Sequence, residues 1–200
     1  MPNASATARN ILAHPVLYRL GGAAETAVLV SDTCVALLFY ALFKPVSRSL
    51  SLSAAVFRLL LVAVIAVSLV NYFAPLGILG NPHFQNAFRT EQLQALALVS
   101  IEAYSTGYDV ALVFFGLHCI LVGYLIFRSL FLPRILGLIM AAAGVAWLTF
   151  LWPPFTAHLY PWVLFPGALG EGLLTLWLLA MGVNPRRWNE QAAQVGYTQC

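Results

Sequence analysis

Charged side chains are scarce in this chain. Asp, Glu, Lys and Arg make up 8% of its 200 residues, whereas hydrophobic residues make up 61%. Soluble domains carry about 25% charged and about 45–50% apolar residues, so a soluble fold of this size would leave much apolar surface in water. The net charge of +3 is small, and the basic residues lie in loops and near the ends of apolar stretches, which argues against nucleic-acid binding. The composition predicts an integral membrane protein.

Cysteines and catalytic motifs are also few. Cys34 and Cys119 lie in apolar stretches and Cys200 is the last residue, so there is neither a CxxC pair nor a disulfide framework. The first 14 residues are polar and lack the apolar core of a signal peptide, so the spans themselves are expected to direct insertion. Neither a nucleophile with a base nor a metal set can be assembled from sequence order.

Five stretches are long and apolar enough to cross a bilayer, which takes about 20 residues in a helix. They cover residues 17–43, 54–79, 107–131, 133–152 and 160–183. Pro75 and Gly77 interrupt the second stretch near its end. The pattern predicts an all-α fold, a polytopic transmembrane helix bundle in a single membrane domain over residues 1–200.

The only long connection runs from residue 80 to residue 106. Within it Leu93, Leu96, Ile101 and Tyr104 recur at helical spacing, which predicts an amphipathic helix over about 91–106 in the membrane interface. A single straight helix over residues 91–131 would be about 60 Å long, twice the hydrocarbon thickness. We therefore expect a break near Gly107.

Basic residues predict the orientation, because they are enriched in cytoplasmic loops. Three basic residues, Arg9, Arg19 and Arg89, do not follow this rule, because the expected topology places them outside. The expected topology puts the C-terminus in the cytoplasm and the N-terminus outside, in a bacterial inner membrane. Three of the basic residues, Arg58, Arg128 and Arg134, are expected to extend to the cytoplasmic headgroups. The full cytoplasmic set is Lys44, Arg48, Arg58, Arg128, Arg134, Arg186 and Arg187.

Polar candidates for a site are the ionisable residues inside the expected spans: Glu25, Asp32, Asp109, His118 and Glu171. A charged residue at the centre of a membrane helix costs about 2.5–3.5 kcal/mol, so each needs a partner or a polar cavity. Glu25 and Asp32 are seven residues apart and share a helix face. A hydrogen-bonded helix contact is the favoured interpretation, with a proton or ion path or a cofactor or partner contact as alternatives.

His118 lies at the same expected depth as Glu171, and the two could pair. Haem or metal ligation by His118 is the disfavoured alternative, because no HxxxH or HExxH spacing supports it. No cofactor is predicted, and the expected small-molecule contacts are membrane lipids.

Glycines at helical spacing predict close helix packing. Gly116 and Gly123 continue a seven-residue series that begins at Glu102 and Asp109 and predicts a packing seam. Glycines flank Glu171 in the fifth span, and their lack of side chains would let a neighbouring backbone approach the carboxylate. These are Gly167, Gly170 and Gly172.

One stretch carries a family resemblance. Residues 108–129, YDVALVFFGLHCILVGYLIFRS, followed by LPRILG at 132–137, resemble the bacterial membrane protein family named domain of unknown function 4386. The resemblance implies a helical membrane fold but no activity. Members usually begin with one further span, so it implies that this chain starts in the outer loop after that span. They often carry an acid just past the fourth span, where this chain has Trp147 to Phe150.

Three classes of function remain. A structural or accessory subunit of a membrane assembly needs only packing seams, anchors and paired polar groups, and it is the favoured class. A small proton- or ion-coupled transporter using the intramembrane acids is the alternative, and an intramembrane enzyme is the third class. Expected partners are helices of other membrane proteins or a second copy of the chain, besides lipids, and no nucleic acid.

Overall fold

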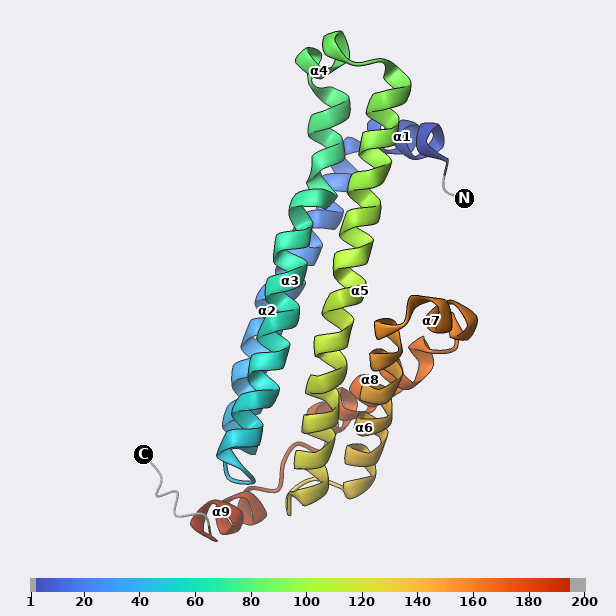
Figure 1. The fold of residues 1–200 in the computed structure, drawn as a ribbon. Coiled ribbons are helices and arrows are strands. Elements are labelled where there is room, and N and C mark those ends of the chain that lie inside the picture. Colours follow the sequence, from blue (N-terminus) through green and yellow to red (C-terminus); the bar gives the residue numbers. More distant parts are fainter. Residues whose placement is uncertain (1–2, 195–200) are drawn as a thin grey trace. The chain divides into compact units, whose positions relative to one another are not determined.

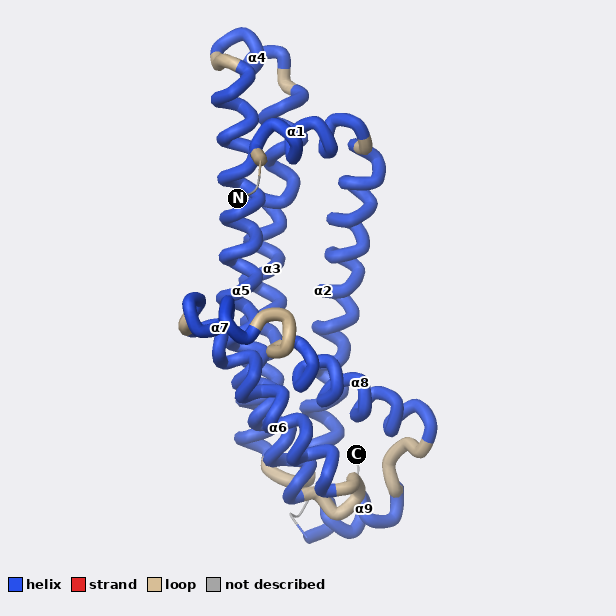
Figure 2. Tube along the Cα trace, turned by 90° about the vertical axis from the view of Figure 1, so that its right-hand side faces the viewer, coloured by secondary structure: helices blue, strands red, loops and turns tan. Residues whose placement is uncertain are grey.

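The computed structural model describes residues 3–194, and Cys200 lies outside the described residues. Helices joined by short connections make up nearly all of this part, and no strand occurs within residues 3–194 (Figures 1 and 2). This confirms the expected all-α fold. In chain order the elements are α1 Ala4–Ala13, α2 Pro15–Phe43, α3 Arg48–Gly80, α4 Pro82–Ala87, α5 Thr90–Arg128, α6 Arg134–Leu148, the 3₁₀ turn η1 Thr149–Leu151, α7 Pro153–Leu159, α8 Leu164–Ala180 and α9 Pro185–Gln194.

Within residues 3–194, four stretches are helical, long and apolar enough to cross a membrane: α2, α3, α5 and α6 with η1. A fifth span results if α7 and α8 are taken together, although the two are bent by 78°. The expected fifth span was one helix over 160–183, whereas α8 alone has 17 residues. Apolar composition identified the span, but the bend between residues 159 and 164 was not visible in it.

Two expected interruptions are wrong. Helix α3 continues through Pro75 to Gly80, and the ring of Pro75 is fully buried, so packing offsets the lost backbone hydrogen bond. Helix α5 continues through Gly107 over 39 residues. A side chain at Gly107 would collide with Ser68 of α3, so this glycine serves close helix contact and does not break the helix.

Two short helices lie outside the five expected spans and the expected interfacial helix. Helix α1 lies in the polar N-terminal segment, where Asn3 Oδ1 accepts hydrogen bonds from the backbone N–H groups of Ser5 and Ala6. Helix α4 lies in the long connection and is capped in the same way by Asn81. Asparagine is among the best N-cap residues, because its side chain satisfies N–H groups that lack helical partners.

The chain divides into two compact units, each described here by itself. Unit 1 comprises Met1–Ser31 and Val62–Asp109, and unit 2 comprises Asp32–Leu61 and Val110–Cys200. In unit 1, Tyr18 and Tyr72 stack with ring centroids 4.5 Å apart, and each hydroxyl donates a hydrogen bond to the other residue's carbonyl oxygen, at 2.6 and 3.0 Å. These paired bonds fix α2 to α3 within unit 1.

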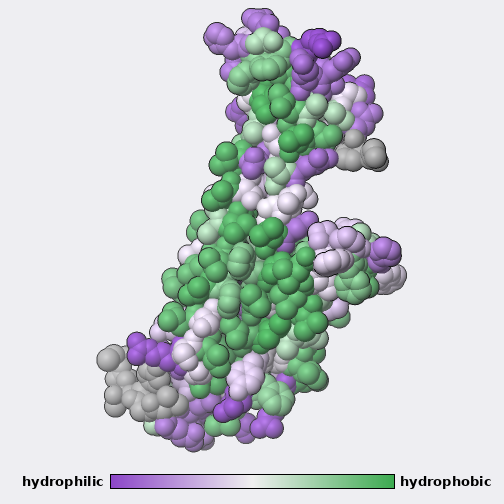
Figure 3. Space-filling model, viewed as in Figure 1, coloured by the Kyte–Doolittle hydropathy of each residue, from purple (hydrophilic) through white to green (hydrophobic). Residues whose placement is uncertain are grey.

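Unit 2 exposes many apolar side chains. On α6, Ile135, Leu138 and Val145 are each about three-fifths exposed, at 59%, 62% and 61%. In Figure 3 the helices of unit 2 present a mainly hydrophobic surface, and hydrophilic residues gather at its lower end. Such a surface is suited to lipid contact, since contiguous apolar patches of this kind are rare on soluble monomers.

Candidate functional site: a buried charged cluster around Arg58

Arg58 lies at the centre of a polar cluster in unit 2. Four helices supply its members: Asp32 from α2, Arg58 from α3, His118 from α5 and Glu171 from α8. Arg58 is 6% exposed, so the expectation that it extends to the headgroups is wrong. The reason is depth. Helix α3 begins at Arg48, ten residues earlier, which places Arg58 about 15 Å along the helix.

The guanidinium pairs with two carboxylates. Its Nε donates to Asp32 Oδ1 at 3.2 Å, and its Nη2 contacts the same oxygen. Its Nη1 lies 3.7 Å from Glu171 Oε1, which is an ion pair beyond hydrogen-bonding distance. The Glu171 side chain is 37% exposed and that of Asp32 20% exposed. Asp32 is therefore the tightly held partner and Glu171 the loosely held one.

His118 is fully buried and its two bonds define its tautomer. Nδ1 lies 2.8 Å from the carbonyl oxygen of Ala54, which can only accept, so Nδ1 carries the proton. Nε2 lies 3.2 Å from Arg58 Nη1, which can only donate, so Nε2 accepts. The imidazole is thus neutral in this arrangement, and both of its nitrogens have protein partners.

Aromatic rings enclose the cluster. Phe39 and Phe115 stack on His118 with centroid distances of 6.1 and 5.8 Å, and the Arg58 guanidinium carbon lies 5.3 Å from the Phe115 ring centre. The last contact is a cation–π interaction. Trp147 of α6 packs beside Phe115, and its buried indole N–H has no hydrogen-bond partner among the described residues.

Charge and depth decide what the cluster can do. With both carboxylates ionised and His118 neutral, the four side chains sum to one negative charge. Each of the four residues lies nine to eleven residues, or about 15 Å, from one end of its helix. These ends are Phe43 for Asp32, Arg48 for Arg58, Arg128 for His118 and Ala180 for Glu171. This depth is half the thickness of the hydrocarbon layer, where an uncompensated charge is costly. Uptake of one proton or one monovalent cation would neutralise the cluster.

Glycines hold α8 on α6 next to Glu171. A Cβ at Gly170 would lie 2.7 Å from the Cβ of Ala143, and one at Gly167 would collide with the ring of Trp147. A Cβ at Gly172 would meet nothing within 4 Å, so the interpretation of Gly172 as a packing glycine is corrected. Gly170, just before Glu171, packs against α6, whereas Gly172, just after Glu171, has open space beside it.

The glycines of α5 face glycines of α6. A Cβ at Gly116 would lie 2.8 Å from the carbonyl oxygen of Gly144, and one at Gly123 would lie 2.6 Å from that of Gly137. Sequence reasoning named only the α5 half of this seam. Gly137 and Gly144 show the same seven-residue spacing as Gly116 and Gly123, and that repeat was the available signal.

Two candidate acids belong to unit 1. Glu25 lies within electrostatic reach of Tyr72 and Tyr104, and Asp109 is half-buried on α5. Of the five ionisable candidates, Asp32, His118 and Glu171 thus meet at Arg58. In place of a direct pair of His118 with Glu171, which the sequence only allowed, an arginine contacts both side chains. In the described part of the chain, no three His, Cys, Asp or Glu side chains are placed to hold a metal ion.

The long apolar helices and the lipid-suited surface define a multi-pass α-helical membrane protein. The chain belongs to the family described as domain of unknown function (DUF4386), whose model matches residues 1–182. It is also similar to an uncharacterized protein of Archaeoglobus fulgidus, with 22% identity over 168 residues, which cover 84% of this chain and 86% of that protein. No solved structure matches the chain significantly.

Proposed function

We propose that this protein is a small proton-coupled transporter, and that the Arg58 cluster is its proton-binding site. The observation that supports this most is one guanidinium between two carboxylates in a buried cluster drawn from four helices. Ionisable groups at such depth are usual in proton relays and ion paths. A pair of one arginine with one carboxylate would be neutral, whereas the second carboxylate gives the cluster a net negative charge that one proton can neutralise.

Glu171 is the residue to which we assign proton exchange. Its ion pair with Arg58 is the longer of the two, and its side chain is the more exposed. Asp32 and neutral His118 hold the guanidinium in place while Glu171 gains and loses its charge. The unpartnered indole N–H of Trp147 supplies a donor for a substrate with an acceptor oxygen near the same site.

The test is proton entry into proteoliposomes that contain the purified full chain and the pH indicator pyranine. A membrane potential is imposed, with and without a small-molecule cell extract outside. We expect faster proton entry than into protein-free liposomes in at least one condition, and we expect Glu171→Gln to return it to the protein-free level. The matched control is Glu91→Gln, an exposed acid in the first turn of α5, which should keep the native rate.

Native proteoliposomes no faster than empty ones, or a Glu171→Gln variant as active as the native chain, would overturn the transporter proposal. The second candidate, a structural or accessory subunit of a membrane assembly, would then be preferred. It is supported by exposed apolar side chains on α2, among them Leu37 at 58% and Leu38 at 65% exposed, which a helix of another protein or a second copy of this chain could cover.

We also propose a location in a bacterial inner membrane with the C-terminus cytoplasmic. With Arg58 removed from the count, six basic residues still lie at the proposed cytoplasmic ends against three on the other side, as the positive-inside rule requires. The six are Lys44, Arg48, Arg128, Arg134, Arg186 and Arg187, and the three are Arg9, Arg19 and Arg89.

Single cysteines at exposed positions test this orientation in an otherwise cysteine-free chain. Cysteines replacing Ser49 or Glu190 should stay unlabelled by an impermeant thiol reagent in intact cells, and those replacing Asn86 or Ala157 should be labelled. All four should react once the membrane is permeabilised. Labelling of Ser49 or Glu190 in intact cells would contradict the orientation.

A further inference from the structure

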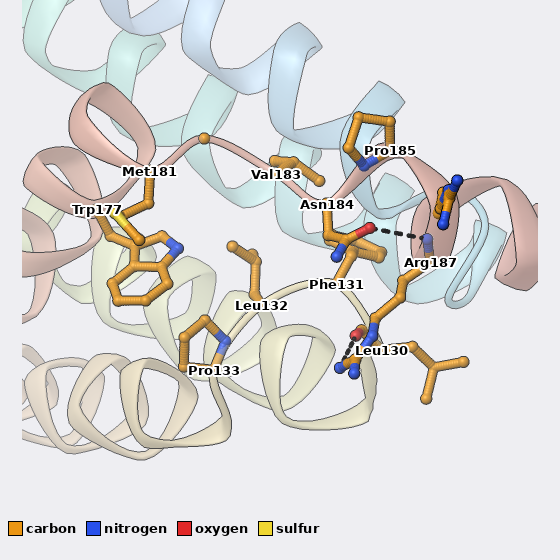
Figure 4. A pocket seen from close by; sticks show the side chains of 12 residues that line it. Leu130, Phe131, Leu132, Pro133, Trp177, Met181, Val183, Asn184, Pro185 and Arg187 are labelled. Carbon is orange, nitrogen blue, oxygen red and sulfur yellow. Dashed lines mark hydrogen bonds between the residues drawn. The ribbon is translucent and has the colours of Figure 1, made fainter.

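A pocket in unit 2 lies between the α5–α6 connection and the segment that joins α8 to α9. It has a volume of about 670 Å³. One part of its wall is apolar and includes Leu132, Trp177 and Met181, and Arg187 lies at another part (Figure 4). Arg186 also lines the pocket. None of its twelve lining residues is Asp or Glu. The pocket therefore combines a positive part with an apolar part.

The two arginines are largely free to bind an anion. Arg187 Nη1 donates to the carbonyl oxygen of Leu130 at 3.3 Å, which uses one of five guanidinium N–H groups (Figure 4). Arg186 makes no hydrogen bond or ion pair with any residue between 3 and 194. Two adjacent guanidinium groups with most of their N–H donors unused by the described residues suit a phosphate, whose oxygens accept several charge-assisted bonds.

Helix α9 is fastened in place, so the pocket exists without a ligand. Trp188 Nε1 donates to the carbonyl oxygen of Leu42 at 2.9 Å. Gln191 accepts a bond from the Leu130 N–H at 3.0 Å and donates to the Arg128 carbonyl oxygen at 3.4 Å. These contacts hold the start of α9, and with it both arginines, beside the end of α8.

We infer that this pocket binds the phosphate headgroup of an anionic membrane phospholipid. Trp177 is three residues, about 5 Å, from the end of α8, which is the depth at which headgroups meet acyl chains. A lipid there would place its phosphate at the arginines and its upper acyl chain along Trp177 and Met181. Basic pockets beside membrane helices are a known mode of anionic-lipid recognition.

Native mass spectrometry of the full chain in detergent tests the inference with dioleoylphosphatidylglycerol and dioleoylphosphatidylcholine as probes. We expect phosphatidylglycerol to bind about tenfold more tightly or better, since it is anionic, whereas phosphatidylcholine would bring its choline cation close to the two arginines. The variant Arg186→Gln/Arg187→Gln should lose this preference. Arg48→Gln/Arg134→Gln, which changes two arginines that do not line the pocket, should keep it.

The single variant Arg186→Gln controls for a folding defect, because Arg186 bonds to no other described residue. It should weaken the binding of phosphatidylglycerol severalfold. Equal binding of the two lipids by the native chain would overturn the inference, as would equal loss in both double variants. Displacement of phosphatidylglycerol by glycerol 1-phosphate at matched concentration would assign the pocket to a soluble phosphate and would also overturn it.

Discussion

Replacing Arg58 by leucine is expected to destabilise the protein by about 3–5 kcal/mol. The substitution removes the only basic partner that the described residues give to Asp32 and Glu171, and it leaves two carboxylates without a cation about 15 Å along their helices. It also removes the donor to His118 Nε2. Unfolding in mixed micelles with increasing fractions of SDS measures the loss.

The charge mechanism predicts a rescue. Arg58→Leu/Asp32→Leu should be more stable than Arg58→Leu alone, because the second change removes an unpaired buried charge. Arg128→Leu serves as the control, since the side chain of this exposed arginine hydrogen-bonds and stacks only with Tyr124 among the described residues, and the change should alter stability by less than about 0.5 kcal/mol. An Arg58→Leu variant as stable as the native chain would mean that Asp32 and Glu171 have other partners or carry no charge.

A matched pair of glycine substitutions is expected to give effects of opposite sign. A Cβ at Gly123 would lie 2.6 Å from the Gly137 carbonyl oxygen and 2.7 Å from the Ala141 nitrogen. Both are backbone atoms that cannot move aside, so Gly123→Ala should force α5 and α6 apart at a cost of about 1–3 kcal/mol. A Cβ at Gly172 would meet open space, so Gly172→Ala should stabilise α8 by up to about 1 kcal/mol.

Both variants keep the charge of the chain and add a single methyl group, so each controls for the other. The same SDS titration measures them, with helix content followed by circular dichroism. If Gly123→Ala proved as stable as the native chain, α5 and α6 would have to lie further apart than the structure places them. Destabilisation by Gly172→Ala would show that a partner or a lipid fills the open side of α8.

Sequence reasoning found most of the cluster for a physical reason. Asp32, His118 and Glu171 stand out because ionisable groups are rare in apolar spans and each needs a partner. The apolar stretch begins at residue 54, which predicts a place near the headgroups for Arg58, whereas α3 begins at Arg48. The sequence does contain a signal for the pairing of Asp32 with Arg58. Asp32 lies twelve residues before Lys44 and Arg58 eleven residues after Ser47, which gives them equal depth on consecutive helices.

The elements that sequence reasoning missed depend on packing or on local hydrogen bonds. Continuity of α3 through Pro75 and of α5 through Gly107 follows from tertiary burial, which overrides the local preference of proline and glycine. The bend between α7 and α8 leaves no mark on average hydropathy. Capping by Asn3 was a readable signal for α1, because asparagine before a helical stretch is a common start.

The two bonds of His118 have a mechanical consequence. Its ring holds α3 at two points one turn apart, the Ala54 backbone and the Arg58 side chain. Sliding α3 along α5 by one residue, about 1.5 Å, would break both bonds together, because neither tolerates such a lengthening. Within unit 2, His118 therefore fixes the position of α3 along α5. If Glu171 exchanges protons as proposed, we expect the accompanying helix movement to involve α8, while α3 and α5 keep their relative position.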